Sequence, residues 1–193
     1  GIATRLALEH VSAAAAGDLV TVIADAALAA RAGLTAEATR RGCPLEDLSC
    51  TLLLLLWARR EDGDWIATFQ AGDGLIAALD ANSIIAPIAT PDTEGTPGET
   101  HFLNGKHVGA TWEGRARAHK TAAGTTGYFV ATVGVSDDLI PYERNGPILA
   151  AGLKSAITAT APGSALLELI GYEKRGSFDD RTLAVAWLAE PRP

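Results

Sequence analysis

The sequence predicts an α+β fold in which antiparallel strands are flanked by helices. Three observations support this class: helical spacing of apolar residues in an alanine-rich first third, a strand–turn–strand pattern in the middle, and two helices followed by a strand at the end. A chain of 193 residues is long enough to bury a sizeable core. We therefore expect a single domain over residues 1–193.

The first third of the chain predicts two helices. Residues 2–16 are rich in alanine, with leucine and valine at intervals, and residues 18–32, opened by Asp18, place apolar residues on one face. Residues 33–48 are more polar and contain a glycine and a proline, which interrupt helices. We expect a short helix or a loop in that stretch.

The middle of the chain changes to a strand-like pattern. Residues 51–57 form a continuous apolar run, which predicts a strand buried on both faces. Asp62-Gly63 is a strong hairpin-turn signal. Residues 65–70 and 75–79, separated by Gly72-Asp73-Gly74, are predicted to continue the same antiparallel meander.

The second half begins with a long polar excursion over residues 89–126, which is rich in Pro, Thr and Gly. The next strand is expected over residues 128–133. Pro147 is expected to start a helix, because proline favours the first helical position. A further helix over residues 163–173 and a strand over residues 182–188 complete the predicted fold.

Charge and composition argue against two classes of partner. The net charge is −7, from 16 basic and 23 acidic residues, and the basic residues are scattered, so nucleic acid is not an expected partner. The apolar run over residues 50–58 is too short to span a bilayer, so no membrane partner is expected. Cys43 and Cys50 fit free thiols in a reducing compartment, which indicates a cytoplasmic location.

Acidic residues follow or precede hydrophobic strands at three places in the chain. These are Asp73 between two glycines, Asp137-Asp138 after the strand that ends near Val133, and Asp179-Asp180 before the last strand. Carboxylates gathered at strand ends, without cysteine pairs or histidine clusters, suit Mg²⁺ or Mn²⁺, which prefer oxygen ligands. His101 and His107 are six residues apart in a polar loop and are only weak candidates for zinc ligands.

The ordered series of these stretches resembles the metal-dependent protein phosphatases of type 2C, especially their bacterial branch. The last motif is moderately specific, and the order and spacing of all of them carry the resemblance over nearly the whole chain. The stretches are "DLSCTLLLLL" (47–56), "FQAGDGLIAAL" (69–79), "ETHFLNG" (99–105), "YFVATVGVSDDL" (128–139) and "SFDDRTLAVAWL" (177–188).

This resemblance implies a fold, a reaction and a set of cofactors. The fold is an antiparallel β-sandwich flanked by helices, in four layers ordered α-β-β-α. The reaction is hydrolysis of phosphoserine or phosphothreonine in proteins, or of a small phosphomonoester. Two Mg²⁺ or Mn²⁺ ions activate a water that attacks phosphorus directly.

The resemblance also assigns roles to individual residues. Asp179 matches the acidic metal ligand of the family's last motif, which is "SFDDRTLAVAWL" here and is called the closing motif below. Asp137 matches the second acid of the family motif before it, "YFVATVGVSDDL". Asp73 matches an acid that helps to hold a further, weaker ion. Asp180 occupies a neighbouring position. The residues expected to line the site without being primary ligands are Val133, Gly134, Asp180, Gly72 and Gly74.

Two departures from the family pattern bear on activity. Val133 stands where the resemblance calls for a metal-binding Asp, and its isopropyl group can donate nothing to a cation. The family's first motif, an Asp-Gly-X-Gly whose carboxylate bridges both metals, has no counterpart in the 193 residues, and the opening "GIATRLALEH" resembles the helix that follows it. We therefore expect the chain to be incomplete at its N-terminus, to lack the first strands of the fold, and to have weak or no activity.

Two functional hypotheses follow, one of them enzymatic. The chain is either a type 2C phosphatase domain with an impaired metal site, or a pseudophosphatase that binds or regulates phosphoproteins. Val133 favours the second hypothesis, whereas the remaining acids favour the first; these are Asp73, Asp137, Asp179 and Asp180. A third reading, an unrelated α+β protein whose acids lie in turns, is disfavoured by the ordered motif series.

Overall fold

The computed structural model describes Arg5 and residues 18–92, 100–172 and 179–187 of the chain. The chain divides into two compact units, each of which draws on two separate stretches of sequence. Unit 1 comprises Gly1–Asp73 with Pro91–Thr121, and unit 2 comprises Gly74–Thr90 with Ala122–Pro193. Apart from Arg5, the predicted helix over residues 2–16 lies outside the described residues.

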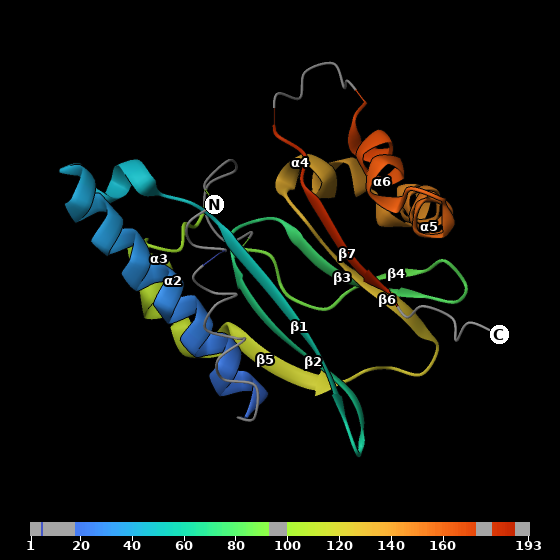
Figure 1. Cartoon of the computed structure of the whole chain (residues 1–193), viewed down its shortest axis with the longest axis horizontal. Coiled ribbons are helices and arrows are strands. Elements are labelled where there is room, and N and C mark those ends of the chain that lie inside the picture. The colour runs from blue at the N-terminus through green and yellow to red at the C-terminus, as the bar shows by residue number, and fades with distance from the viewer. Residues whose placement is uncertain (1–4, 6–17, 93–99, 173–178, 188–193) are drawn as a thin grey trace. The chain divides into compact units, whose positions relative to one another are not determined.

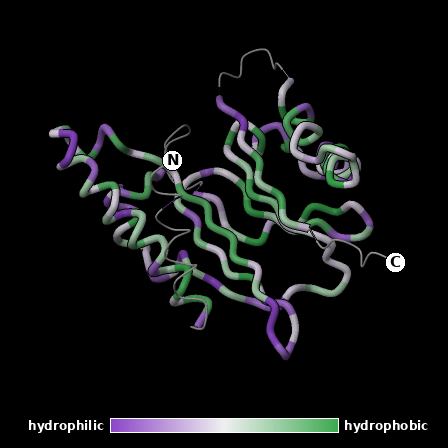
Figure 2. The backbone as a smooth tube through the Cα atoms, in the orientation of Figure 1, coloured by the Kyte–Doolittle hydropathy of each residue, from purple (hydrophilic) through white to green (hydrophobic). Residues whose placement is uncertain are grey.

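Unit 1 is an antiparallel sheet of three strands in the order β1-β2-β5, covered by a long helix (Figure 1). The β1–β2 hairpin pairs Leu52 with Ala71 at one end and Arg60 with Gly63 at the other, as the Asp-Gly signal predicted. Its hydrophilic tip contrasts with the hydrophobic middle of both strands (Figure 2). The elements are α2 (Leu19–Arg41), η1 (Leu45–Leu48), β1 (Leu52–Arg60), β2 (Gly63–Ala71), α3 (Lys106–Ala110), η2 (Trp112–Gly114) and β5 (Ala116–Lys120).

Both ends of α2 are capped as the sequence suggests. The Asp18 carboxylate accepts the backbone N–H of Thr21 at 3.1 Å. Gly42 ends the helix with a φ of 65°, a left-handed conformation that favours glycine. The helix therefore runs continuously to Arg41. The prediction that a separate short helix or a loop begins at residue 33 is wrong.

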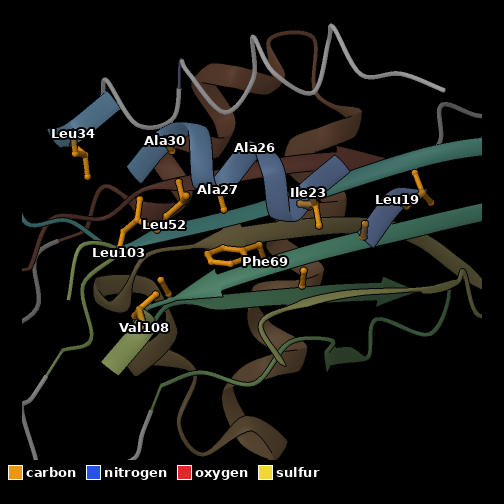
Figure 3. Close-up of a cluster of buried hydrophobic side chains, with 13 residues drawn as sticks. Leu19, Ile23, Ala26, Ala27, Ala30, Leu34, Leu52, Phe69, Leu103 and Val108 are labelled. Carbon is orange, nitrogen blue, oxygen red and sulfur yellow. The ribbon is translucent and has the colours of Figure 1, made fainter. Parts of the chain in front are cut away.

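The core of unit 1 lies between α2 and its sheet. Ile23, Ala26 and Ala30 of the helix are at most 1% exposed, as is Phe69 of β2. Figure 3 shows these side chains between the helix and the strands. The small alanine side chains let the helix backbone approach the strands closely, and Phe69 also packs on the Trp112 ring, with 4.8 Å between centroids.

The apolar composition of α2 also gives it the length and hydropathy of a membrane span. Eight of its residues are buried in unit 1, among them Leu19, Ile23 and Leu34. Burial against the sheet accounts for part of the hydrophobicity of this helix.

Unit 2 is an antiparallel sheet of four strands in the order β4-β3-β6-β7, with two helices that pack on each other, one of which also contacts the sheet. Leu75, Ala77 and Phe129 of the sheet join Ala150 and Leu153 of α5 in one buried cluster. The elements are β3 (Leu75–Asp80), β4 (Ile85–Pro87), β6 (Thr125–Ala131), α4 (Val133–Ser136), η3 (Asp137–Leu139), α5 (Tyr142–Thr158), α6 (Pro162–Ile170) and β7 (Leu183–Trp187).

The predicted α+β class with antiparallel sheets is confirmed, but the single meander is wrong. Gly72-Asp73-Gly74 does not join two strands of one sheet, because β2 belongs to the sheet of unit 1 and β3 to that of unit 2. β1 is half-buried along most of its length rather than buried on both faces. The polar excursion also contains an unpredicted strand, β5, which pairs with β2.

Two expectations about the second half are also corrected. Pro147 does not start a helix but lies inside α5, whose N-cap is Pro141. Asn145 explains the earlier start, because its amide donates to the backbone oxygens of Asp138 and Ile140 and ties the first turn to the preceding loop. Val133 is not the tip of a strand but the first residue of the short helix α4.

Candidate functional site

The end of β6 is bonded directly to the segment that enters β7. Thr132 donates its backbone N–H to the Thr182 oxygen at 3.1 Å, and its hydroxyl accepts the Thr182 N–H at 2.9 Å. The same hydroxyl donates to the backbone oxygen of Asp180 at 3.0 Å. These bonds fix the turn that carries Val133 against the acidic pair of the closing motif.

Gly134 shows how close this approach is. A Cβ at Gly134 would lie 2.8 Å from the Asp180 oxygen and 3.1 Å from the Asp179 Cβ. Asp179 and Asp180 are exposed, whereas Val133 is half-buried beside them. The structure therefore brings four of the predicted site residues together in unit 2, and two of the four, Val133 and Gly134, have no side-chain ligand atom.

Arg181 clamps this arrangement from within unit 2. Its guanidinium donates to the backbone oxygens of Gly134 at 3.1 Å and Tyr172 at 3.0 Å, and pairs with the Asp138 carboxylate at 3.4 Å. The Tyr172 hydroxyl also donates to Asp138. Burial, followed by this bond to Asp138, raises the pKa of Tyr172 above its ordinary value. Asp138 is thus occupied by structural contacts.

Asp137 lies in η3, the turn that follows α4, and its side chain is exposed. Burial, and secondarily the negative charge of Asp137, raises the pKa of Tyr142. The assignment of Asp137 as a metal ligand stays a prediction that rests on the family resemblance.

The Gly72-Asp73 turn belongs to unit 1, where contacts with other residues of the unit hold it in place. Gly72 has a φ of 114°, and a Cβ there would lie 2.4 Å from the Thr51 Cγ2 atom, so only glycine fits. The half-buried Asp73 accepts the Thr100 hydroxyl at 3.1 Å. Gly74 is the first residue of unit 2. The role of Asp73 in holding an ion also stays a prediction.

A buried ion pair lies next to this turn in unit 1. The Arg115 guanidinium donates to the Asp92 carboxylate at 2.7 Å, and the side chains are 9% and 12% exposed, respectively. The same carboxylate oxygen accepts the Gly72 N–H at 2.8 Å. Burial alone would raise the pKa of Asp92, but the bonds from Arg115 and Gly72 outweigh it and hold the pKa below its usual range.

Asp92 also completes a cluster that sequence reasoning missed. The imidazole rings of His101 and His107 stack with their centroids 3.8 Å apart. The His101 Nδ1 atom lies 3.7 Å from the second Asp92 oxygen. The histidine spacing gave a weak signal, but nothing in the sequence joined Asp92 to it.

The exposed acids of unit 2 carry the ligand type that a hard cation accepts. Exposed carboxylates are suitable oxygen ligands for Mg²⁺ or Mn²⁺, which retain several waters. Two dications close together need several protein carboxylates to offset their repulsion. Val133 supplies none at the position that adjoins Asp179 and Asp180.

Two comparisons with known proteins find a similarity to this chain. A family model described as "Protein phosphatase 2C" matches residues 2–168. No curated protein sequence matches the chain at a significant level. Among solved structures, the chain is similar to "PppA, a key regulatory component of T6SS in Pseudomonas aeruginosa", with 15% sequence identity and a TM-score of 0.48. That similarity covers 88% of this chain and 70% of the other.

Proposed function

Because the chain belongs to the protein phosphatase 2C family, we propose that it is a phosphatase domain for phosphoserine or phosphothreonine in proteins, with a weakened metal site. The observation that carries the proposal is the bonding of Thr132 to Asp180 and Thr182. These bonds hold the turn between β6 and Val133 against the acidic pair Asp179-Asp180, where Val133 has an aliphatic side chain.

The residues of this chain would act by positioning charge. Asp179 would hold a Mg²⁺ or Mn²⁺ ion, with Asp137 of the same unit as a further ligand, and Asp73 of unit 1 would help to hold a further, weaker ion. Such an ion supplies an activated water and neutralises phosphoryl oxygens. Arg181 would keep the closing segment in place, because its guanidinium is committed to Gly134, Tyr172 and Asp138 rather than to a substrate.

Val133 also favours a second candidate, a pseudophosphatase that binds phosphoproteins without hydrolysing them. A phosphate dianion near Asp179 and Asp180 is repelled unless a cation lies between them. Binding of a phosphopeptide at this place should therefore require a divalent ion even if no hydrolysis follows. We also propose a cytoplasmic location, which rests on the free thiols alone.

The decisive experiment is calorimetric titration of Mn²⁺ and Mg²⁺ into the original chain and into Val133→Asp. The expected result is micromolar binding by Val133→Asp and at least tenfold weaker binding by the original chain. Val133→Asn is the matched control, because it has the same shape as the aspartate but no charge, and it should gain much less affinity. Equal affinity in all three chains would contradict the proposed role of position 133.

Hydrolysis of p-nitrophenyl phosphate separates the two candidates. The original chain should turn over very slowly with Mn²⁺. If Val133→Asp gains chelator-sensitive turnover, the domain is an impaired phosphatase. Metal-dependent binding of a phosphothreonine peptide by both chains, without turnover by either, would support the pseudophosphatase. Rapid chelator-sensitive turnover by the original chain would overturn the claim of impairment.

A further inference from the structure

We propose that Asp92, His101 and His107 of unit 1 form a zinc site, separate in chemistry from the oxygen-ligand site proposed above. The ligand atoms of the three side chains lie within 4.8 Å of one another. Two imidazoles and one carboxylate are the ligand types that Zn²⁺ accepts, whereas Mg²⁺ prefers oxygen alone.

The buried histidine gives an independent indication of a ligand. His101 is 8% exposed, and its Nδ1 atom is buried without a hydrogen-bond partner. A buried polar atom without a partner costs free energy, so it is expected to have a function or an unseen ligand. At 3.7 Å, the distance from Nδ1 to the Asp92 Oδ1 atom is too long for a hydrogen bond.

That distance suits a shared ion better than a direct bond. Zinc bonds of about 2.1 Å in a tetrahedral site put ligand atoms roughly 3.4 Å apart. His101 and Asp92 are therefore already near the required separation. The exposed His107 ring stacks on that of His101, so it has to rotate out of the stack before its nitrogen can point at the same ion.

Hydrogen bonds from neighbouring groups orient the Asp92 carboxylate, as such bonds commonly orient the carboxylate ligands of metal ions. Arg115 and the Gly72 N–H both bind the Asp92 Oδ2 atom, which leaves Oδ1 directed toward His101. The Arg115 charge opposes a bound cation, so we expect micromolar rather than nanomolar affinity. An ion here would tie the Asp92 segment to the loop of His101 and to α3.

The first test is calorimetric titration of Zn²⁺ into the original chain, His107→Asn and His119→Asn. His107 is the informative position because its side chain is exposed, so its loss should not prevent folding. His119 is the matched control, an exposed histidine on β5 of the same unit. We expect one Zn²⁺ per original chain, unchanged binding by His119→Asn, and binding weakened by a factor on the order of 100 in His107→Asn.

Two further measurements locate the ion. Co²⁺ bound to nitrogen and oxygen should give visible d–d absorption that His107→Asn abolishes. Zn²⁺ should also raise the thermal midpoint of the original chain and of His119→Asn, but not that of His107→Asn.

Three outcomes would overturn the proposal. One is no binding of Zn²⁺ by the original chain, and another is equal binding by the two histidine variants. The third is strong near-ultraviolet charge transfer from thiolate to Co²⁺, which would place the ion on Cys43 or Cys50. None of these results bears on Mn²⁺ binding at Asp179, so this inference and the proposed phosphatase function can fail separately.

Discussion

Thr132 and Thr182 bind each other through two hydrogen bonds, one between their backbones and one from the Thr182 N–H to the Thr132 hydroxyl. Thr132→Val keeps the shape of the side chain but removes the hydroxyl, so the Thr182 N–H loses its acceptor. We expect a loss of about 1 kcal/mol in the free energy of unfolding, and faster hydrogen exchange at the Thr182 amide. Urea unfolding and NMR would measure both effects. Thr132→Ser keeps the hydroxyl and should change neither, and equal losses in the two variants would contradict this role.

Arg181 should resist even a conservative replacement. Lysine keeps the positive charge but cannot bind two backbone oxygens and Asp138 at once. Arg181→Lys is expected to lower the free energy of unfolding by roughly 2 kcal/mol, because several hydrogen bonds of a charged group are lost. Arg144→Lys, at an exposed arginine of the same unit, should be nearly neutral in the same denaturant titration. A neutral Arg181→Lys would show that the clamp contributes little.

Gly72 and Gly63 allow backbone strain to be separated from crowding. Their φ angles are 114° and 119°, but a Cβ would collide with Thr51 at Gly72 and meet nothing within 4 Å at Gly63. Gly63→Ala should cost roughly 1–3 kcal/mol from backbone strain alone. Gly72→Ala should cost at least about 1 kcal/mol more, because the neighbouring side chain must move. Chemical denaturation of both variants tests this order, and the reverse order would refute it.

Only the buried face of α5 should contribute to the stability of unit 2. Leu153 is 0% exposed, whereas Ile148 on the same helix is 70% exposed. Leu153→Ala is expected to cost about 2–5 kcal/mol, since it leaves a cavity in a packed cluster. Ile148→Ala should stay within about 0.5 kcal/mol of the original chain. Similar losses at both positions would mean that the exposed face of α5 is covered in solution.

The end of α2 should contribute a pH-dependent stability. Glu37 accepts Arg40 Nε at 2.7 Å and Arg41 Nε at 2.6 Å, and these bonds, with Arg40 the larger cause, lower the pKa of Glu37 from 4.5 to about 2. Because the folded-state pKa is depressed, the stabilisation is complete above pH 4.5 and disappears as the pH falls toward 2.

Glu37→Gln should therefore have a slightly lower urea midpoint than the original chain at neutral pH, and the same midpoint near pH 2. The difference should be small and should shrink in high salt, as for other surface ion pairs. Glu113→Gln, at an exposed glutamate of the same unit, is the control. A difference that grows as the pH falls would contradict the assigned sign.

The parts of the fold that depend on local chemistry could be predicted from the sequence. Asp18 and Gly42 bound α2 through bonds within a few residues, and Asp62-Gly63 is a local turn signal, to which Lys120 adds a bond to the Asp62 backbone oxygen. The assignment of strands to sheets depends on pairing between distant residues, so the change of sheet after Gly72 left no local signal. β5 was missed for the same reason, since its polar sequence becomes a strand only by pairing with β2.

In the candidate site, too, the contacts between residues far apart in sequence were the ones that the sequence did not predict. The contact between Gly134 and Asp179 joins residues far apart in sequence, and only the family resemblance suggested that their segments meet. The family resemblance predicts that Val133 replaces a metal ligand, which stays a prediction, but its placement on a strand was wrong, because a hydrophobic run says little about where a strand ends. Asp92 was overlooked because its orientation depends on Arg115, a partner that the sequence does not reveal.

The interleaving of the two units has a consequence for how the protein is made. Residues 91–121 complete unit 1 after the first two strands of unit 2 have already been synthesised. During synthesis, the β1–β2 hairpin therefore forms before its third strand, β5, is available for pairing. In the other sheet, β3 is synthesised well before its neighbour β6 and the last strand, β7. No cut at one peptide bond yields an intact unit, so this chain should be expressed whole rather than dissected into fragments.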